Sequence, residues 1–312
     1  MRHLAMLCAA LLCEALLCAA GACSPARDET SATLRDVVQL GRVEAGALSE
    51  LSGVVRSTAT PALFWSFNDS GHDATLFAMD SSGRARGRVH VAGASNVDWE
   101  AMAAGPCDEG ACVYIGDVGD NDADRQRVKI WRVREPEAGD DNTANAVALE
   151  FTYADGPHDV EAMWVSPDTA IWIVTKRPLR DGARRFRSAL LFRLPASAWR
   201  SPTLATAELI DSLPITPRKG NSDGWVTDAA FFRDEGADSA RHRARVAIRT
   251  YQSVVILAAD PWTGRPGVTE ARCSLEPLHE REGEAIAWLR GGRLLLGNEG
   301  RHSRLASGRC QP

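Results

Sequence analysis

Two carboxylates separated by a single residue, Asp98 and Glu100, carry the clearest chemical signal in this sequence. Residues two apart in an extended strand point to the same face, so the two carboxylates would lie side by side. The apolar segment that follows them ends at Asp117, which adds a third acid nearby. Hard cations such as Ca²⁺ bind carboxylate oxygens, and a crowded carboxyl group can also stay protonated and act as a general acid. The pattern therefore predicts a metal site or an acid–base site.

The same couplet returns along the chain, and this repetition indicates how the chain folds. The copies are Glu50–Ser52, Asp98–Glu100, Asp159–Glu161, Val226–Asp228 and Glu282–Glu284. They are roughly 50 to 65 residues apart, with about four short apolar segments in each interval, which is typical of a β-propeller. We therefore predict an all-β, five-bladed β-propeller, with a β-sandwich or an irregular barrel as the alternative.

The two ends of the chain together provide about one more blade. We expect the inner strands of this last blade within residues 284–306 and its outer strand at residues 37–43. The N-terminal strand would then complete the last blade and leave no exposed sheet edge.

The start of the first strand and the end of the second strand lie at the same face of a propeller blade, so the polar residues there should line one mouth of the channel. The predicted metal ligands are Asp98, Glu100, Asp117, Asp159, Glu161, Glu282 and Glu284. The predicted contacts to a small polar ligand are Asn68, Asp69, Asp120, Asn121, Lys176, Arg249 and Glu299. Lys176 and Arg249 are the cations expected to oppose these acids, with Glu50 and Asp228 at the same mouth. The alternative is that each acid only caps a turn by accepting backbone N–H groups.

The amino terminus has the pattern of an export signal. A basic start is followed by an apolar run and by Ala20-Gly21-Ala22, directly before Cys23. We expect residues 1–22 to be a signal peptide, Cys23 to be lipidated, and residues 23–36 to form a lipid-anchored tether before a single domain at 37–312. A plain secretory signal or a short membrane anchor is the alternative. The predicted location is the periplasm or the periplasmic face of the outer membrane, with membrane contact only through the lipid.

The remaining cysteines support export. Cys107 and Cys112 flank a short loop and are expected to pair, which leaves Cys273 to pair with Cys310. A zinc site is the rival interpretation, although neither a close second pair nor a histidine cluster accompanies these cysteines.

Composition limits the partners of the domain. The chain of 312 residues is 45% hydrophobic and 25% charged, which is an ordinary globular balance. A formal net charge of −5 gives no reason to expect nucleic-acid binding. We expect a small polar molecule or a component of the cell envelope as the partner, and the sequence does not indicate an oligomeric state.

Several short motifs together resemble an exported bacterial propeller family that is described as esterase-like or phytase-like and is mostly uncharacterised. They are Ser52-Gly53, Asn68-Asp69-Ser70-Gly71, Asp98-Trp99-Glu100, the run from Gly116 to Asn121 with Arg125 after it, Tyr153-Ala154-Asp155-Gly156, Glu161-Ala162 and Thr175-Lys176. More distantly, the chain is similar to calcium-dependent lactonase and phytase propellers, which place acidic ligands at the channel mouth. The resemblance implies an acidic, calcium-binding mouth, although Val226 stands where the other copies have a first acid.

These observations lead to two expectations about function. The first is an exported propeller that binds Ca²⁺ and a small polar ligand, with hydrolysis of an ester, a phosphate or a lactone as its sharper form. The alternative is a non-catalytic binding or scaffold propeller of the cell envelope whose acids are structural.

Overall fold

The computed structural model describes residues 32–311 apart from three gaps, at 177–186, 218–222 and 235–242. Its longer elements are all β-strands. The helical elements of the described part are short 3-10 turns: η1 (Ala196–Arg200), η3 (Glu276–Leu278) and η4 (Arg290–Gly292). No helix in the described part is long and apolar enough to span a membrane. The predicted all-β class is confirmed.

Consecutive strands form antiparallel meanders. The first sheet is β3 (Leu51–Arg56), β4 (Leu63–Asn68), β5 (Thr75–Asp80) and β6 (Ala85–His90). The second sheet contains two meanders: β7 (Trp99–Cys107), β8 (Gly110–Asp117), β9 (Val128–Arg134) and β10 (Val147–Tyr153), then β11 (Val160–Val165), β12 (Ile171–Thr175), β13 (Leu190–Leu194) and β14 (Ala205–Ser212). Parallel pairing of the two outer strands, β10 and β14, joins these meanders into one sheet.

The remaining two sheets each include a strand from the amino terminus. One is β15 (Val226–Arg233), β16 (Ala244–Thr250), β17 (Ser253–Ala259) and β18 (Pro266–Ser274), with β1 (Ala32–Thr33) added in parallel to β18. The other is β19 (Gly283–Trp288), β20 (Leu294–Asn298), β21 (Arg304–Arg309) and β2 (Arg35–Arg42). Because β2 pairs antiparallel with β21, the prediction that an N-terminal strand completes the last sheet is confirmed.

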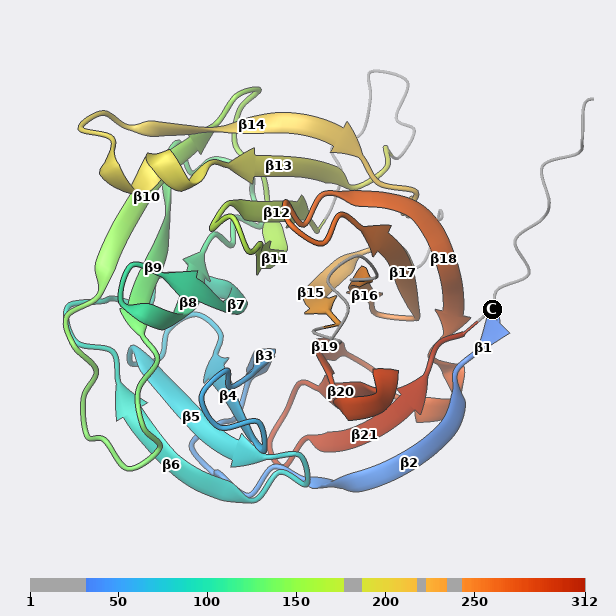
Figure 1. Cartoon of the computed structure of the whole chain (residues 1–312). Helices are drawn as coiled ribbons and strands as arrows, with labels where there is room; N and C mark the ends of the chain where they lie inside the picture. The colour runs from blue at the N-terminus through green and yellow to red at the C-terminus, as the bar shows by residue number, and fades with distance from the viewer. Residues whose placement is uncertain (1–31, 177–186, 218–222, 235–242, 312) are drawn as a thin grey trace, which may run out of the picture. The chain divides into compact units, whose positions relative to one another are not determined.

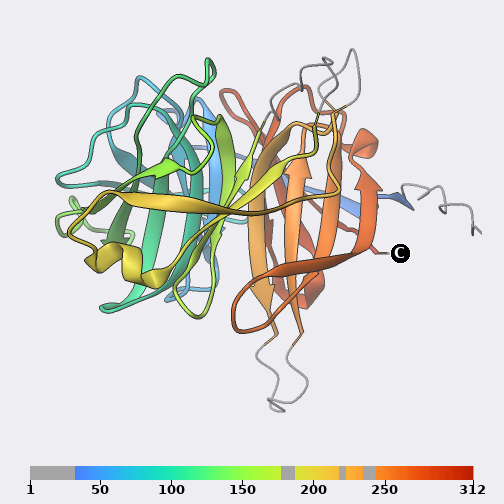
Figure 2. The same ribbon diagram turned by 90° about the horizontal axis from the view of Figure 1, so that it is seen from above.

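The first strand of each meander lies innermost, around a central axis (Figure 1). These inner strands contact one another in a closed ring, which runs β3, β7, β11, β15, β19 and back to β3. In the view turned by 90°, the strands of neighbouring sheets stand side by side (Figure 2). The inner strands are apolar along most of their length and are buried because sheets cover them on both faces. The arrangement is β-propeller-like.

Aromatic side chains fill the layers between neighbouring sheets. Trp65, Trp99 and Trp164 are fully buried, as expected for tryptophans that pack between sheets. Phe67 of the first sheet meets Trp99 of the second edge to face, with ring centroids 5.7 Å apart. This packing fixes Trp99 at the start of β7, and with it the positions of its neighbours Asp98 and Glu100.

Both predicted disulfides are present. Cys273 in β18 is bonded to Cys310, which directly follows β21, so this bond links two neighbouring sheets. β1 pairs with the same stretch of β18, and Ala32 lies opposite Cys273. Both β1 and the first residues of β2 fall within the range 23–36 that the sequence predicts to be a tether.

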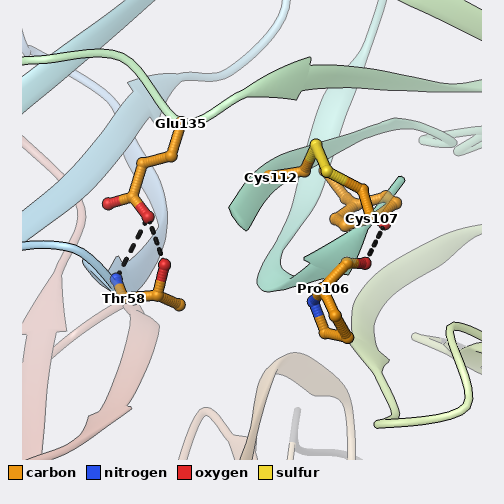
Figure 3. Close-up of a disulfide and its surroundings, with 6 residues drawn as sticks. Thr58, Pro106, Cys107, Cys112 and Glu135 are labelled. Carbon is orange, nitrogen blue, oxygen red and sulfur yellow. Dashed lines mark hydrogen bonds between the residues drawn. A yellow bond between two sulfur atoms is a disulfide. The ribbon is translucent and has the colours of Figure 1, made fainter. Parts of the chain in front are cut away.

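The second disulfide, between Cys107 and Cys112, closes the hairpin between β7 and β8 (Figure 3). The hydroxyl of Tyr114 donates a hydrogen bond of 2.6 Å to the backbone carbonyl of Pro106 beside it. In the same region Glu135, which follows β9, accepts a hydrogen bond of 3.1 Å from the backbone N–H of Thr58 (Figure 3). These contacts hold the loops of the first and second meanders together at the end of the inner strands.

Candidate metal centre

Each inner strand carries one extra residue close to its start, relative to the second strand of its meander. The register shifts at Ser52 and Gly53 in β3, at Glu100 in β7, at Glu161 in β11, at Thr227 in β15 and at Glu284 in β19. An extra residue of this kind is a β-bulge, which bends the strand and re-aims a side chain. The bulges bring the repeated polar position of the sequence to the same level in every inner strand.

This register corrects the sequence alignment in one copy. The sequence comparison matches Asp228 with Glu100, but the bulge lies at Thr227, so Thr227 is the equivalent of Glu100 and Asp228 lies one position deeper in the strand. The couplets in the other copies contain an acid that guides the alignment. In β15 the equivalent pair is Trp225 and Thr227, which contains no acid.

The ends of the second strands meet the starts of the inner strands through a repeated backbone hydrogen bond. The N–H of the residue after the second strand donates to the carbonyl of the residue two before the bulge. The bonds are Asp69 to Glu50 (3.1 Å), Val118 to Asp98 (3.1 Å), Lys176 to Asp159 (2.9 Å) and Glu299 to Glu282 (2.9 Å). Side chains from the two predicted sets therefore gather at one end of the inner strands.

Three of the acids at this end converge closely enough to hold one ion. Asp69, Asp98 and Glu100 each offer a carboxylate oxygen, and these oxygens lie within 4.8 Å of one another. Asp69 follows β4 of the first sheet, whereas Asp98 directly precedes β7 and Glu100 is its second residue. We call these three residues the acidic triad. The triad could bind a metal ion.

Close packing around the acidic triad fixes its geometry. Glu100 is 5% exposed, and its Oε2 atom accepts a 2.8 Å hydrogen bond from the hydroxyl of Ser52 at the equivalent bulge of β3. The backbone of Gly119 lies against the two carboxylates of the couplet. A Cβ atom there would lie 2.5 Å from the carboxylate carbon of Asp98 and 2.7 Å from Cγ of Glu100. A Cβ atom at this position would force the acids to move, so the absence of a side chain at Gly119 lets the loop after β8 lie directly against them.

The triad is electrostatically unfavourable by itself. Burial and the neighbouring charge of Asp69 raise the pKa of Asp98 to about 6, although Arg125 acts in the opposite direction. Burial, again with Asp69, raises the pKa of Glu100 well above its usual range, against the effects of Lys176 and the Ser52 hydroxyl. A bound cation would remove both penalties, because an opposite charge at short range favours the ionised carboxylate.

The two cations nearest the triad are engaged by other acids. The Nη2 atom of Arg125 donates to Asp117 at 2.8 Å, and Nζ of Lys176 pairs with Glu161. Asp117 also accepts the backbone N–H of Asp98 at 3.2 Å through the same oxygen, and its other carboxylate oxygen is buried without a hydrogen-bond partner. The structure therefore gives Asp117 a positioning contact to the couplet.

Several other predicted site residues hold backbone groups. Oδ1 of Asn68 accepts the N–H groups of Ser49 and Glu50, and its Nδ2 donates to the carbonyl of Ala47 at 2.7 Å. Asp120 accepts the N–H groups of Asp124 and Arg125, both at 2.9 Å. Asn68 and Asp120 therefore cap loops, which is the alternative that the sequence left open for single residues.

Asp159, Asn121, Glu282 and Glu299 lie around the same mouth. Asp159 is buried and accepts the N–H of Asp120 at 3.1 Å, whereas Asn121 and Glu282 are exposed. Burial and the charge of Glu282 raise the pKa of Glu299.

A second buried charged group lies beside the triad. It consists of Glu161, Lys176, Glu284 and Tyr251, and we call it the Lys176 group. Burial raises the pKa of Glu161 well above its usual range and the pKa of Glu284 to about 7. Burial alone would lower the pKa of Lys176, but Glu161, Tyr251 and Glu284 outweigh that effect and raise it. The Lys176 ammonium lies 5.9 Å from the centre of the Tyr251 ring.

Arg249 lies in a third, separate arrangement. Its side chain is fully buried, forms an ion pair with Glu280, and donates to the carbonyls of Ala285 at 2.8 Å and Gly297 at 3.1 Å. Asp228 is fully buried as well, and its two oxygens accept the N–H groups of Ala229 at 2.7 Å and Ile286 at 2.8 Å. Arg249 therefore pairs with Glu280 and with backbone carbonyls. Among the acids it was expected to oppose, its charge acts on Glu284 and Asp228 and acts to lower the pKa of both.

Two residues at this mouth, Tyr251 and Glu280, are absent from the predicted sets. Tyr251 follows the end of β16 as Asp69 follows β4 and Lys176 follows β12, so the repeat alone could have identified its position. Glu280 lies in the loop before β19, outside the repeated couplet. The ion pair between Glu280 and Arg249 therefore cannot be recognised from sequence spacing.

Comparisons with known proteins give no family. No protein-family model matches the chain, and no curated protein matches its sequence. The resemblance to esterase-like and phytase-like propellers therefore stays a prediction.

Solved structures of propellers show a distant likeness. The soluble aldose sugar dehydrogenase from Escherichia coli in the apo-form has 10% identity and a TM-score of 0.48, over 88% of this chain and 99% of that one. Virginiamycin B lyase from Staphylococcus aureus has 10% identity and a TM-score of 0.40, over 82% and 65%. The Dos1 propeller has 8% identity and a TM-score of 0.35 over 80% of this chain, which spans about half (52%) of that structure. Likeness of this degree carries no argument about activity.

Proposed function

We propose that the chain is a five-bladed propeller that binds Ca²⁺ through Asp69, Asp98 and Glu100. The closed ring of inner strands, each followed by three further strands when β2 is counted in the last sheet, supports the blade number. The single observation that carries the metal site is the convergence of three carboxylate oxygens within 4.8 Å. Such an all-oxygen ligand set suits a hard cation, and it lacks the nitrogen and sulfur ligands that zinc sites commonly contain.

Charge balance supports the same proposal. The acidic triad brings together three carboxylates, while Arg125 and Lys176 are paired with Asp117 and Glu161. A divalent cation would balance most of the remaining charge. Ca²⁺ accepts six to eight oxygens in flexible geometry, so ligand oxygens and water can complete a site of three carboxylates.

The proposed ligand is a small polar molecule that binds at the ion. In the sharper form of the proposal the chain hydrolyses an ester, a phosphate or a lactone, and the bound ion supplies polarisation of the substrate oxygen. Glu284, with a pKa of about 7, has the protonation behaviour of a general acid or base, and Lys176 places a positive charge beside it.

A second candidate function is a binding or scaffold propeller without catalysis. The observation that favours it is the internal use of Asn68, Asp120 and Asp228, whose side chains hold backbone N–H groups. In that case Ca²⁺ would stabilise the mouth without turnover. Divalent-ion-dependent hydrolysis of a panel of small esters, phosphates and lactones supports the enzyme, whereas calcium-dependent melting without turnover supports the scaffold.

Isothermal titration with CaCl₂ tests the metal site itself. The wild type should bind one ion, and Asp98→Asn should weaken binding at least about tenfold because it removes a formal charge from the ligand set. Glu109→Gln, which neutralises an exposed turn residue, is the matched control and should leave the affinity unchanged. Unchanged calcium affinity in Asp98→Asn would contradict the proposal that the acidic triad binds the ion.

We also propose a location in the cell envelope. Two disulfides suit an oxidising, extracytoplasmic compartment. Lipidation of Cys23, which lies outside the described residues, would hold the domain at the membrane through the residues that precede β1. Cell fractionation of the wild type and Cys23→Ser checks this proposal: the wild type should sediment with membranes and the variant should not, and a wild type free in the periplasm would contradict it.

A further inference from the structure

The opposite ends of the inner strands line a second cavity, whose walls are apolar and basic where the mouth is acidic. A cavity of about 1050 Å³ lies among the last residues of β3, β7, β11, β15 and β19. Its walls are mainly apolar and include Val54, Met102, Met163, Phe231 and Trp288. A volume of this size matches the pockets that bind drug-sized molecules, which are lined mostly by apolar side chains with a few polar groups.

The charged groups at this cavity are mostly arginines. Arg56, Arg233 and Arg290 line it, and Asp234 is the one acid among the described residues of the lining. Arg56 and Arg290 also line an adjoining cavity of about 630 Å³, so these two arginines stand at a shared rim. Burial and the like charge of Arg290 lower the pKa of Arg56. Two guanidinium groups are thus held near each other where an anion would relieve their repulsion.

Local contacts position two of the arginines, whereas Arg290 is exposed at the rim. The Nε atom of Arg56 donates to the carbonyl of Pro61 at 3.0 Å, which leaves the other guanidinium N–H groups to a ligand. Arg233 lies over the ring of Trp262 at 4.6 Å, and its Nε atom is buried without a hydrogen-bond partner. The hydrogen bond of Glu135 to Thr58 and the nearby disulfide brace the loops beside this end of the channel (Figure 3). The cavity therefore combines an apolar lining with two positioned arginines and a third, Arg290, at its exposed rim.

We propose that this end of the channel binds a small amphiphilic anion, with its apolar body in the cavity and its carboxylate or phosphate head between Arg56 and Arg290. Guanidinium groups form paired N–H···O bonds with both kinds of head group. The apolar walls contribute by burying the body of the ligand. This inference does not depend on calcium binding at the acidic triad.

Titration calorimetry with decanoate and decyl phosphate, below their micellar concentrations and in chelator, tests the proposal. The wild type should bind at least one of them, and at least about tenfold more tightly than decyltrimethylammonium, which has the same chain and the opposite charge. The double variant Arg56→Gln/Arg290→Gln should weaken anion binding about tenfold, which corresponds to roughly 1.4 kcal/mol. The control double variant Arg127→Gln/Arg134→Gln removes the same charge from exposed positions and should bind like the wild type.

A cavity-filling variant, Ala104→Phe, separates the apolar wall from the arginines. It leaves every charge in place but occupies space in the cavity, so it should also weaken binding of the anion. Thermal melts confirm that each variant is folded. Equal affinity of the wild type and the arginine double variant, no preference for the anionic probes, or no binding of either anion by the wild type would overturn the proposal.

Discussion

Two charged groups, one at the acidic mouth and one buried beneath it, use the same residue types in opposite ways. In the acidic triad, carboxylates from β7 and from the end of β4 meet one another, with nearby cations already paired elsewhere. At the β15–β19 contact, Asp228 meets backbone N–H groups, and Arg249 meets Glu280 and two carbonyls. The first arrangement is short of positive charge, whereas in the second each charged group has a partner within the protein, although the Nε atom of Arg249 is buried without one.

The difference shows that the neighbours of a carboxylate at the mouth indicate whether it is a candidate metal ligand or a structural acid. A carboxylate that accepts several N–H groups is stabilised as an anion and acts as a structural link. Burial raises the pKa of Asp228 well above its usual range, although its backbone N–H donors and Arg249 act in the opposite direction. A carboxylate whose closest charged neighbours are other carboxylates would instead be stabilised by a cation from solution. Breaking each arrangement in turn should therefore give different dependences on calcium.

The largest effect is expected when Arg249 is removed. Arg249→Leu would leave Glu280 (6% exposed) unpaired and would remove the donor from two buried carbonyls. Breaking a buried pair from one side costs about 3–5 kcal/mol, and this loss should be the same with calcium and with chelator. Urea unfolding followed by tryptophan fluorescence measures it. Arg245→Leu, which removes a more exposed pair with Glu270, should cost less than about 1 kcal/mol, and a similar loss in both variants would contradict the contrast.

The next effect concerns Asp228. The amide nitrogen in Asp228→Asn cannot accept an N–H group, so either Ala229 or Ile286 loses its partner inside the protein. The free energy of unfolding should fall by about 1–3 kcal/mol. Melts in calcium and in chelator should show the same loss. A loss confined to the calcium buffer would instead make Asp228 a metal ligand.

A smaller effect is expected from a single methyl group at the triad. Gly119→Ala would place Cβ against the carboxylate of Asp98, which must move from its present position. Calcium affinity should fall about tenfold, or roughly 1.4 kcal/mol in binding free energy. Gly139→Ala is the matched control, since a Cβ atom there meets open space. Titration calorimetry that finds equal affinities in the two variants would show that the loop after β8 does not shape the site.

The smallest expected effect is a pH dependence in chelator. The pKa of Asp98 is raised from 3.8 to about 6, so the folded protein binds this proton more tightly than the unfolded chain does. The associated stability is fully present below pH 3.8 and is lost as pH rises through 6. After allowance for solvent screening, the loss should be about 1 kcal/mol.

Melts between pH 4 and pH 7 in chelator check this slope. Asp98→Asn should make it shallower, and saturating calcium should do the same in the wild type; Glu284, whose pKa is about 7, contributes the part that remains. Asp260→Asn is the control: backbone hydrogen bonding from Thr263 lowers the pKa of Asp260, so its titration lies below this range. A slope that is unchanged in Asp98→Asn would contradict the raised pKa.

The sequence predicted the sheets better than it predicted the site. The repeated couplets gave the all-β class and the N-terminal strand in the last sheet, because alternation and repeat length are local properties. The copy at Val226–Asp228 was misaligned by one residue, since Thr227 lacks the charge that marks the other copies. A shift of one residue in a strand changes the direction of every side chain, which moved Asp228 from the mouth to the interior.

The partners of the acids depend on contacts between different sheets. Asp69 was predicted as a ligand contact apart from the metal set, and the structure brings it to Asp98 and Glu100 from the neighbouring sheet. Glu280 reaches Arg249 from a loop that carries no repeat signal. Sequence spacing determines which residues share a strand face, but only packing determines which charges neutralise one another.

Thermal melts of the wild type and Glu100→Gln, each with excess calcium and with chelator, test the metal site most directly. The glutamine retains an oxygen that can accept from Ser52, so the variant removes mainly the charge. If the triad binds calcium, the variant should melt at an equal or higher temperature than the wild type in chelator, because repulsion is relieved. In excess calcium it should melt lower, because it lacks part of the stabilisation of about 2.7 kcal/mol that a ligand at 100 times its Kd provides. Equal losses in both buffers would contradict the metal site and identify Glu100 as a structural acid.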